Sequence, residues 1–234
     1  MNSIVLQVAL AVVPAILAIT LHEAAHGYAA LALGDDTARR AGRLSLNPLR
    51  HVDRVGTILL PGFLLIFQLL TIHRVLFMFG WAKPVPVSAW KFRDPRRGMA
   101  VVATAGPLMN FFLAWLGAVL LPTSVHSLVG EMAGQFLSYF ILTNLVLGLF
   151  NLIPIPPLDG GRIAVGILPL ELARWWARLE RVGILLVVVL LLLPHLVAGF
   201  DPLGNALETV VPWAINLVLR LAGHDVGGGA DVRL

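Results

Sequence analysis

The stretch His22-Glu23-Ala24-Ala25-His26 lies inside an apolar run that covers residues 4–33. An HExxH motif on a helix places two imidazoles one turn apart on the same face, as a zinc site requires. At 100° per residue, Glu23 points about 80° away from the mean direction of the two histidines. It can therefore act on a water molecule near the metal, but it is poorly aimed to be a ligand. Because ionisable groups are costly inside a bilayer, the stretch predicts a metal site in or near a membrane.

The composition is that of an integral membrane protein. The 234 residues are 58% hydrophobic and 13% charged, with a mean hydropathy of +0.86. A soluble domain would carry about twice that charged fraction, so we expect no large soluble domain. The net charge of +4 comes from short clusters between apolar runs, which indicate membrane topology rather than a nucleic-acid surface. The absence of cysteine excludes disulfides and thiolate ligands.

The pattern of apolar runs predicts an all-α polytopic fold with about five full transmembrane helices. The runs cover about residues 4–33, 99–121, 130–152, 180–199 and 204–222. A further apolar stretch, about 55–80, is interrupted by Pro61-Gly62 and His73-Arg74. We expect it to be a re-entrant hairpin, since irregular backbone is tolerated at membrane depth where protein buries it. The alternative is that 55–80 is a sixth span.

Charge counting favours the hairpin. Arg and Lys are frequent in the loops at 35–54, 81–98 and 162–181 and absent from the links at 122–129 and 200–203. The positive-inside rule places the three basic loops in the cytoplasm, which works only if residues 55–80 enter and leave on the same side. The first helix and helix 130–152 then both run toward the cytoplasm. This orientation brings the HExxH motif and Asp159, which follows helix 130–152, to a similar depth.

A catalytic zinc site takes three protein ligands and leaves one position for water. Asp159 is the best third ligand beside His22 and His26, because it lies in a break rich in Pro and Gly after an apolar helix. Its ordinary alternative role is a helix cap. His51 is the second choice as ligand, although a loop histidine at the membrane surface is the more common use.

Two other features near this break and in the loop at 81–98 each allow two interpretations. Asn151 could stabilise an oxyanion, or it could bond to backbone carbonyls freed near Pro154. In segment 83–88, two prolines block one edge of a strand, while Val85 and Val87 leave the other edge open. That edge could bind an unwound substrate as an added strand. The alternative is a polyproline-type connector without a partner.

The order of these motifs resembles the site-2 protease family of intramembrane zinc metalloproteases, and more narrowly a compact prokaryotic branch of it. The resemblance covers about residues 15–165. It is carried by the HExxH motif, by residues 46–53, 80–87 and 106–110, and by the stretch Asn151-Leu152-Ile153-Pro154-Ile155-Pro156-Pro157-Leu158-Asp159-Gly160-Gly161. One departure is Leu158, where many members have Pro; we expect no loss of metal ligation from it.

The resemblance implies a role for each motif residue. His22, His26 and Asp159 are the expected ligands of one zinc ion per chain, and Glu23 is the expected general base. Asn151 is the expected substrate-contacting catalytic residue, and the edge at Val85 and Val87 is the expected substrate-binding strand. The implied reaction is hydrolysis of peptide bonds within or near the transmembrane segments of single-span membrane proteins.

The expected organisation is one integral membrane domain, residues 1–222. It has a catalytic core at about 4–165 and accessory helices at about 168–222, followed by a flexible tail at 223–234. Residues 168–181 contain two Trp and three Arg and predict an interfacial helix. We expect a location in a prokaryotic inner membrane, with the site nearer the cytoplasm, lipid as a partner and no nucleic acid. The rival classes are a zinc transporter or sensor, and an inactive relative that binds membrane helices.

Overall fold

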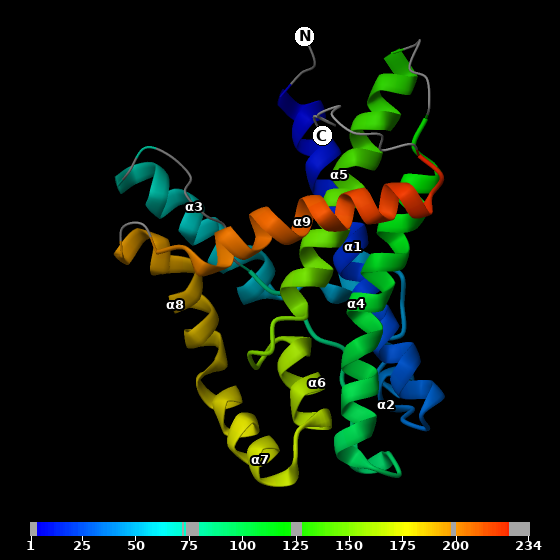
Figure 1. The fold of residues 1–234 in the computed structure, drawn as a ribbon, viewed down its shortest axis with the longest axis vertical. Helices are drawn as coiled ribbons and strands as arrows, with labels where there is room; N and C mark the ends of the chain where they lie inside the picture. The colour runs from blue at the N-terminus through cyan, green and yellow to red at the C-terminus, as the bar shows by residue number, and fades with distance from the viewer. Residues whose placement is uncertain (1–3, 72, 74–79, 123–127, 198–199, 225–234) are drawn as a thin grey trace.

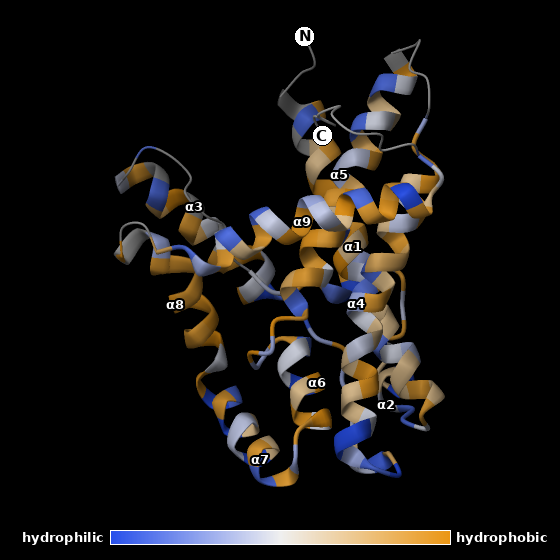
Figure 2. Cartoon of the chain, in the orientation of Figure 1, coloured by the Kyte–Doolittle hydropathy of each residue, from blue (hydrophilic) through white to orange (hydrophobic). Residues whose placement is uncertain are grey.

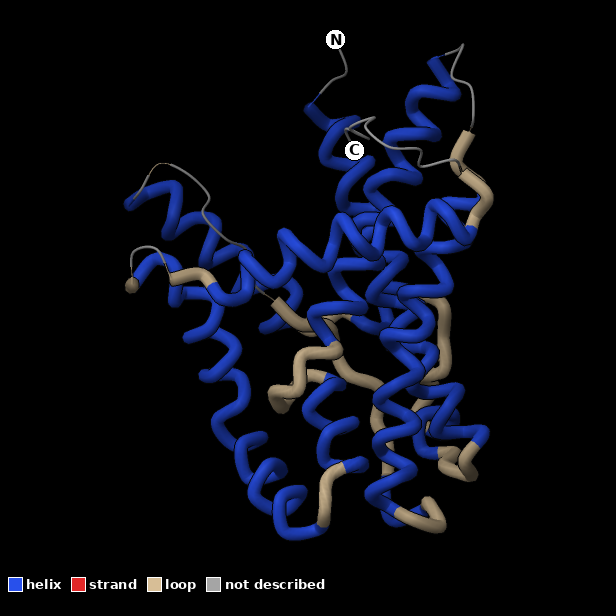
Figure 3. The backbone as a smooth tube through the Cα atoms, viewed as in Figure 1, coloured by secondary structure: helices blue, strands red, loops and turns tan. Residues whose placement is uncertain are grey.

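The computed structural model describes residues 4–71, 73, 80–122, 128–197 and 200–224 of the chain (Figure 1). The described part is helical, and no strand occurs in it (Figure 3). The α-helices are α1 (Ile4–Ala32), α2 (Thr37–Arg40), α3 (Leu60–Thr71), α4 (Pro95–Val119), α5 (Leu128–Asn151), α6 (Asp159–Ile167), α7 (Leu170–Arg178), α8 (Gly183–Leu196) and α9 (Pro202–Leu221). Four shorter helical turns are η1 (Pro48–His51), η2 (Arg54–Leu59), η3 (Ala89–Lys91) and η4 (Leu179–Val182).

Helices α1, α4 and α5 pack against one another and form the centre of the molecule (Figure 1). Within the described residues, these three helices are long and apolar enough to cross a membrane. Helices α1 and α5 run in the same direction and α4 runs in the opposite one (Figure 1). Their contacts use small residues such as Ala18, Ala114 and Ala118, none of which is exposed. Small side chains let helix backbones approach closely, which is how membrane helices pack without a hydrophobic driving force.

The start of α4 is fixed by its own sequence. Pro95 is the first residue of the helix, and the Asp94 carboxylate accepts hydrogen bonds from the backbone N–H groups of Arg96 and Arg97. A proline at the first position and a capping aspartate satisfy the donors that a helix start leaves unpaired. This places the arginines of α4 at one end of the bundle, where hydrophilic residues also gather on α7 (Figure 2).

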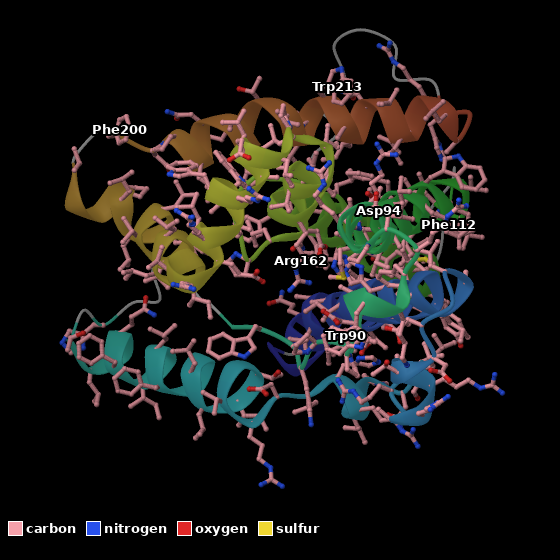
Figure 4. The ribbon with its side chains drawn as sticks, turned by 90° about the horizontal axis from the view of Figure 1, so that it is seen from below. Trp90, Asp94, Phe112, Arg162, Phe200 and Trp213 are labelled. Atoms are coloured by element: carbon pink, nitrogen blue, oxygen red, sulfur yellow. The ribbon has the colours of Figure 1, made fainter. Side chains whose placement is uncertain are left out.

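The prediction of five full spans is not confirmed. Helix α8 has 14 residues and rises about 21 Å, short of the roughly 30 Å of a hydrocarbon core. Helix α9 crosses over α5 and α4 instead of running alongside them (Figure 1). Its buried stripe of Val211, Ala214 and Val218 faces α4 and α5, while Trp213 points away from them (Figure 4). Because α9 has one apolar stripe of this kind, it packs across the bundle as a surface helix does.

The two ends of the interrupted apolar segment 55–80 meet in the structure. The backbone N–H of Trp81 donates to the carbonyl of Gly56 at 3.1 Å, and the Thr57 hydroxyl donates to the carbonyl of Trp81 at 2.8 Å. The Trp81 indole lies so close to Gly56 that a Cβ there would collide with the ring. Residues 72 and 74–79 lie outside the described part. A segment whose ends are joined in this way favours the hairpin over a single crossing.

The small strand expected at 83–88 is not formed in the described part of the chain. Two of its backbone N–H groups are engaged by side chains instead: that of Val85 donates to Glu23 at 3.0 Å, and that of Ser88 donates to Asp35 at 2.6 Å. Val85 is buried, and Val87 packs against Ala30 and its neighbours. The segment is therefore an extended connector attached to α1. Most of the predicted tail, from residue 225 on, lies outside the described residues.

Candidate metal centre

His22 and His26 of α1 face Asp159, the first residue of α6, at the contact of α1, α4 and α6. The Oδ2 atom of Asp159 lies 3.1 Å from Nε2 of His22 and 3.3 Å from Nε2 of His26. The two Nε2 atoms are 3.0 Å apart. All three side chains are buried. Within the described residues, this is the group of His and acidic side chains whose ligand atoms converge as a metal site requires.

The hydrogen bonds of the histidines define which ring nitrogen carries the proton. Nδ1 of His22 is 2.6 Å from Oδ1 of Asn110, and Nδ1 of His26 is 2.7 Å from the carbonyl oxygen of Val102. Both partners are acceptors, so each Nδ1 is the protonated nitrogen and donates. In a neutral ring with this tautomer, the unprotonated Nε2 is the atom that faces Asp159. Such outer hydrogen bonds commonly fix the tautomer of metal-binding histidines.

These donor atoms fit a divalent cation. Two Nε2 lone pairs and a carboxylate oxygen would repel one another at these distances without a positive charge between them. The buried Oδ2 of Asp159 has no hydrogen-bond donor among the described residues. Tetrahedral zinc with bonds of about 2.0–2.2 Å separates its ligands by roughly 3.3–3.5 Å, close to the observed 3.0–3.3 Å. Imidazole and carboxylate ligands suit zinc.

The backbone around Asp159 explains why two glycines follow it. A Cβ on Gly160 would collide with the carbonyl groups of Leu152 and Ile153, and one on Gly161 would collide with the backbone of Pro156. Helix α6 therefore begins directly against the Pro-rich break. The N-cap position belongs to Leu158. The Asp159 carboxylate faces the histidines, so the alternative role as a cap does not describe it.

Glu23 lies beside this group but is not one of the converging residues. Its half-buried side chain accepts the hydrogen bond from Val85 N–H through Oε2. Segment 83–88 is therefore adjacent to the expected general base. A glutamate that is held next to the converging ligands, and outside them, has the arrangement expected from the geometry of HExxH.

Two other predicted residues make different contacts. Asn151 donates from Nδ2 to the carbonyl of Leu147, one turn back in α5, at 3.0 Å, and not to a carbonyl near Pro154. His51 is buried and its Nε2 is 2.8 Å from the carbonyl of Ser45. Neither belongs to the converging group formed by the described residues. Asp159 therefore agrees with the structure better than His51 as the third ligand.

The part played by α4 was not predicted. Gly106 and Asn110 carry only the resemblance at residues 106–110, with no role of their own, and Asn144 is not among the expected site residues. In the structure a Cβ on Gly106 would lie 2.5 Å from Cε1 of His22 and from Nε2 of His26. The signal for the asparagines was available, because an amide within a membrane-length apolar run is costly unless it is hydrogen-bonded.

Comparison with known proteins identifies similar chains among metalloproteases. The sequence model of peptidase family M50 matches residues 123–194. The "Putative zinc metalloprotease YwhC" of Bacillus subtilis is 40% identical over 190 residues, which cover 78% of this chain and 80% of the relative. The "Putative zinc metalloprotease Rip2" of Mycobacterium tuberculosis is 30% identical over 189 residues, covering 79% of this chain and 67% of that protein. No solved structure matches the chain.

Proposed function

The chain belongs to peptidase family M50, and we propose that it is a zinc metalloendopeptidase that cleaves membrane proteins within or near their transmembrane segments. The names of its relatives support the zinc and the protease activity. The three long apolar helices support a membrane location. The proposed substrates are single-span membrane proteins embedded in the same lipid bilayer. We propose no role in nucleic-acid binding.

One observation carries this proposal. Three buried metal-binding atoms, from His22, His26 and Asp159, converge within 4.8 Å of one another, and the tautomer of each histidine presents a lone pair toward the others. We propose that these residues hold one zinc ion per chain. When bound, zinc lowers the pKa of water and polarises a carbonyl group as a Lewis acid.

The protein side of the reaction then falls mainly to Glu23. Its carboxylate takes a proton from the attacking water as the water oxygen bonds to the scissile carbonyl carbon. The same carboxylate then delivers that proton to the nitrogen of the leaving amine as the C–N bond breaks. Burial of the site among α1, α4 and α6 strengthens these electrostatic interactions. The hydrogen bond from Val85 N–H holds Glu23 beside the ligands rather than among them.

Substrate contacts are proposed at Asn151 and in segment 83–88. Asn151 can support an oxyanion if its amide turns from Leu147 toward the site. A transmembrane helix hides its peptide bonds in hydrogen bonds from residue i to residue i−4, so a substrate must unwind before hydrolysis. We propose that the unwound chain lies along the segment that contains Val85 and Val87. Since Val85 N–H is already bonded to Glu23, the substrate would pair with the remaining backbone groups.

The proposed topology keeps the predicted organisation. The domain covers residues 1–222, with a catalytic core at about 4–165 and accessory helices at about 168–222. The basic loops face the cytoplasm of a prokaryotic inner membrane, and the site lies nearer that side. Five crossings and one hairpin remain our proposal for the full count. The Gly56–Trp81 hydrogen bond supports the hairpin.

The test is the amount of zinc that the purified full-length chain holds. We expect about one ion per chain in the wild type and a large loss in Asp159→Ala. The matched control is Asp201→Ala, which removes a carboxylate that caps α9 far along the chain. Undiminished zinc in Asp159→Ala would show that the third ligand is another residue, with His51 as the next to substitute.

A further inference from the structure

We propose that Asn110 and Asn144 are positioning residues that fix the tautomer and ring orientation of His22, and thereby set the zinc affinity of the site. This inference rests on the proposed function, because it assumes that His22 is a zinc ligand. It goes further in assigning a role to two amides, one in α4 and one in α5. The Asn110 side chain contacts the expected ligand His22. Of these side chains, Asn144 contacts Asn110 alone.

The hydrogen bonds of the two amides fix which end of each amide faces His22. Nδ2 of Asn144 lies 2.8 Å from the carbonyl oxygen of Phe140, which can only accept. Oδ1 of Asn144 therefore faces Asn110 and accepts from its Nδ2 at 2.9 Å. This leaves Oδ1 of Asn110 toward His22, where it accepts from Nδ1 at 2.6 Å. A backbone carbonyl of α5 thus determines which nitrogen of His22 carries the proton.

Burial makes this arrangement hard to reverse. Asn110 and Asn144 both have 0% exposed surface, so water cannot replace a lost partner. If the Asn110 amide turned over, its NH₂ group would face His22 and its oxygen would face the Asn144 oxygen. Buried polar groups left unpaired in this way keep the full cost of leaving water without a hydrogen bond to offset it. The rotation is therefore disfavoured at both ends, and Nε2 of His22 remains unprotonated toward Asp159.

The two histidines are held by different kinds of acceptor. His26 donates to the backbone carbonyl of Val102, which no side-chain substitution removes, whereas His22 depends on a side chain. Val102, Gly106 and Asn110 are spaced four residues apart and so lie along one face of α4. This face has a hydrogen-bond acceptor at each end. Between them, Gly106 has no side chain, and the imidazoles lie in that space. Helix α4 therefore supports both rings, and only the support of His22 can be changed by substitution.

The experiment measures zinc affinity by competition with a chelator, using the full-length protein in detergent. Asn110→Ala removes the acceptor, and we expect a loss of about 10–100-fold, typical for such outer partners. Asn110→Asp keeps the acceptor for Nδ1 of His22 but places a second oxygen against Oδ1 of Asn144, so we expect a smaller loss than in Asn110→Ala. Asn144→Ala removes the nearer of the two acceptors of Asn110 Nδ2 and leaves the carbonyl of Ala18 at 3.4 Å, so we expect an intermediate loss of about tenfold or less. The absorption spectrum of the Co²⁺-loaded protein should change in the Ala variants and be retained in Asn110→Asp.

Non-additivity separates a positioning role from general destabilisation. If Asn144 acts through Asn110, the double Ala variant should lose no more affinity than Asn110→Ala alone. Thr104→Val is the matched control on α4. It removes a hydroxyl that donates to Ala100, and its affinity should equal that of wild type. Circular dichroism of each variant checks that the helices remain folded.

The outcomes distinguish this inference from the proposed function. Wild-type zinc content with no loss in His22→Ala would overturn the ligand assignment itself. Zinc that depends on His22 but is bound equally well by Asn110→Ala, with an unchanged Co²⁺ spectrum, would overturn only the role of the amides. Additive losses in the double variant would show that Asn144 does not act through Asn110.

Discussion

Glu23 and its two neighbouring histidines lie on the same helix, but they make different contacts. The histidines face Asp159, whereas Glu23 accepts a hydrogen bond from Val85. We therefore expect Glu23→Gln to keep wild-type zinc content and to lose about 10²–10⁴-fold in cleavage rate, the usual contribution of general acid–base catalysis. The measurement is zinc content together with single-turnover cleavage of a membrane substrate.

Glu131→Gln is the control for that substitution. Glu131 is exposed in the first turn of α5, so the same chemical change there should leave both zinc and rate unchanged. Substantial residual turnover in Glu23→Gln, with zinc retained, would mean that another group accepts the proton.

Gly106 has a specific steric requirement at the metal centre. Because a Cβ there would lie 2.5 Å from both imidazoles, we expect Gly106→Ala to displace the rings and weaken zinc binding by about tenfold or more. Gly134→Ala on α5 is the matched control, since its Cβ would meet no atom within 4 Å. Chelator competition on the two variants measures the difference. Equal zinc affinity in both would mean that α4 can move away from α1 without disturbing the ligands.

The residues that sequence could identify are those with a recognisable spacing. HExxH fixes the relation of His22, Glu23 and His26 on one helix, whatever the rest of the fold does. Asp159 could be proposed because few acidic residues occur in apolar surroundings. Asn144 could not be linked to His22, since that link depends on how α4 lies between α1 and α5, and spacing within one helix does not give the packing between helices.

At the scale of elements, segment 83–91 is attached to the end of α1 through Asp35. The fully buried carboxylate accepts bonds from Ser88 N–H at 2.6 Å and Thr37 N–H at 2.9 Å, and Lys91 lies 3.2 Å away. Burial opposes ionisation, but the bonds from Ser88 and Thr37 outweigh it and lower the pKa of Asp35 to about 2. The charged carboxylate is thus the form that holds the segment in place.

Asp35→Asn should therefore destabilise the protein in a pH-dependent way. Since the folded pKa is below the unfolded value of about 3.9, the contribution of the charge is fully present above about pH 4. It is lost as the pH falls from about 4 toward 2. At pH 6 we expect Asn to lower the free energy of unfolding by about 1–3 kcal/mol. The gap in Tm between wild type and variant should narrow as the pH falls below 4.

The control is Asp36→Asn, at a more exposed carboxylate, which should have a smaller effect on Tm. A gap in Tm between wild type and Asp35→Asn that does not change with pH would show that the charge of Asp35 is not what stabilises the segment.

The elements themselves were partly predictable. Apolar runs gave the extents of α1, α4 and α5 to within a few residues, because a membrane-length helix requires a continuous apolar sequence. The strand at 83–88 is not confirmed, and the connector left open as its alternative describes the segment better, since the pattern of prolines could not reveal that Glu23 and Asp35 accept the N–H groups of Val85 and Ser88. The direction of α9 was also not predictable, because hydropathy reports which residues avoid water and not the helix against which they pack.

At the scale of the whole molecule, charged and apolar side chains gather on different parts of the surface. Arginines gather at one end, and apolar side chains are exposed on α3 and α8. Arg96 and Arg97 begin α4, and Arg174 and Arg178 lie on α7 at the same end (Figure 2). Exposed apolar side chains cover α3 and α8, including Phe63, Leu70 and Leu185. Large exposed apolar surfaces of this kind are expected where a protein contacts lipid.

Topology can be tested directly because the chain contains no cysteine. Leu49, Trp90 and Val129 are 77%, 82% and 76% exposed, so single cysteines at these positions should accept a membrane-impermeant thiol reagent. Leu49 and Trp90 lie on either side of segment 55–80, whose ends are joined between Gly56 and Trp81. We expect Leu49→Cys and Trp90→Cys to be labelled only from the cytoplasmic face of sealed vesicles, and Val129→Cys only from the opposite face. Labelling of Leu49→Cys and Trp90→Cys from opposite faces would make segment 55–80 a full crossing. It would also reverse the direction of α4 and α5 relative to α1, which is incompatible with His26 facing Val102 and His22 facing Asn110 across antiparallel helices.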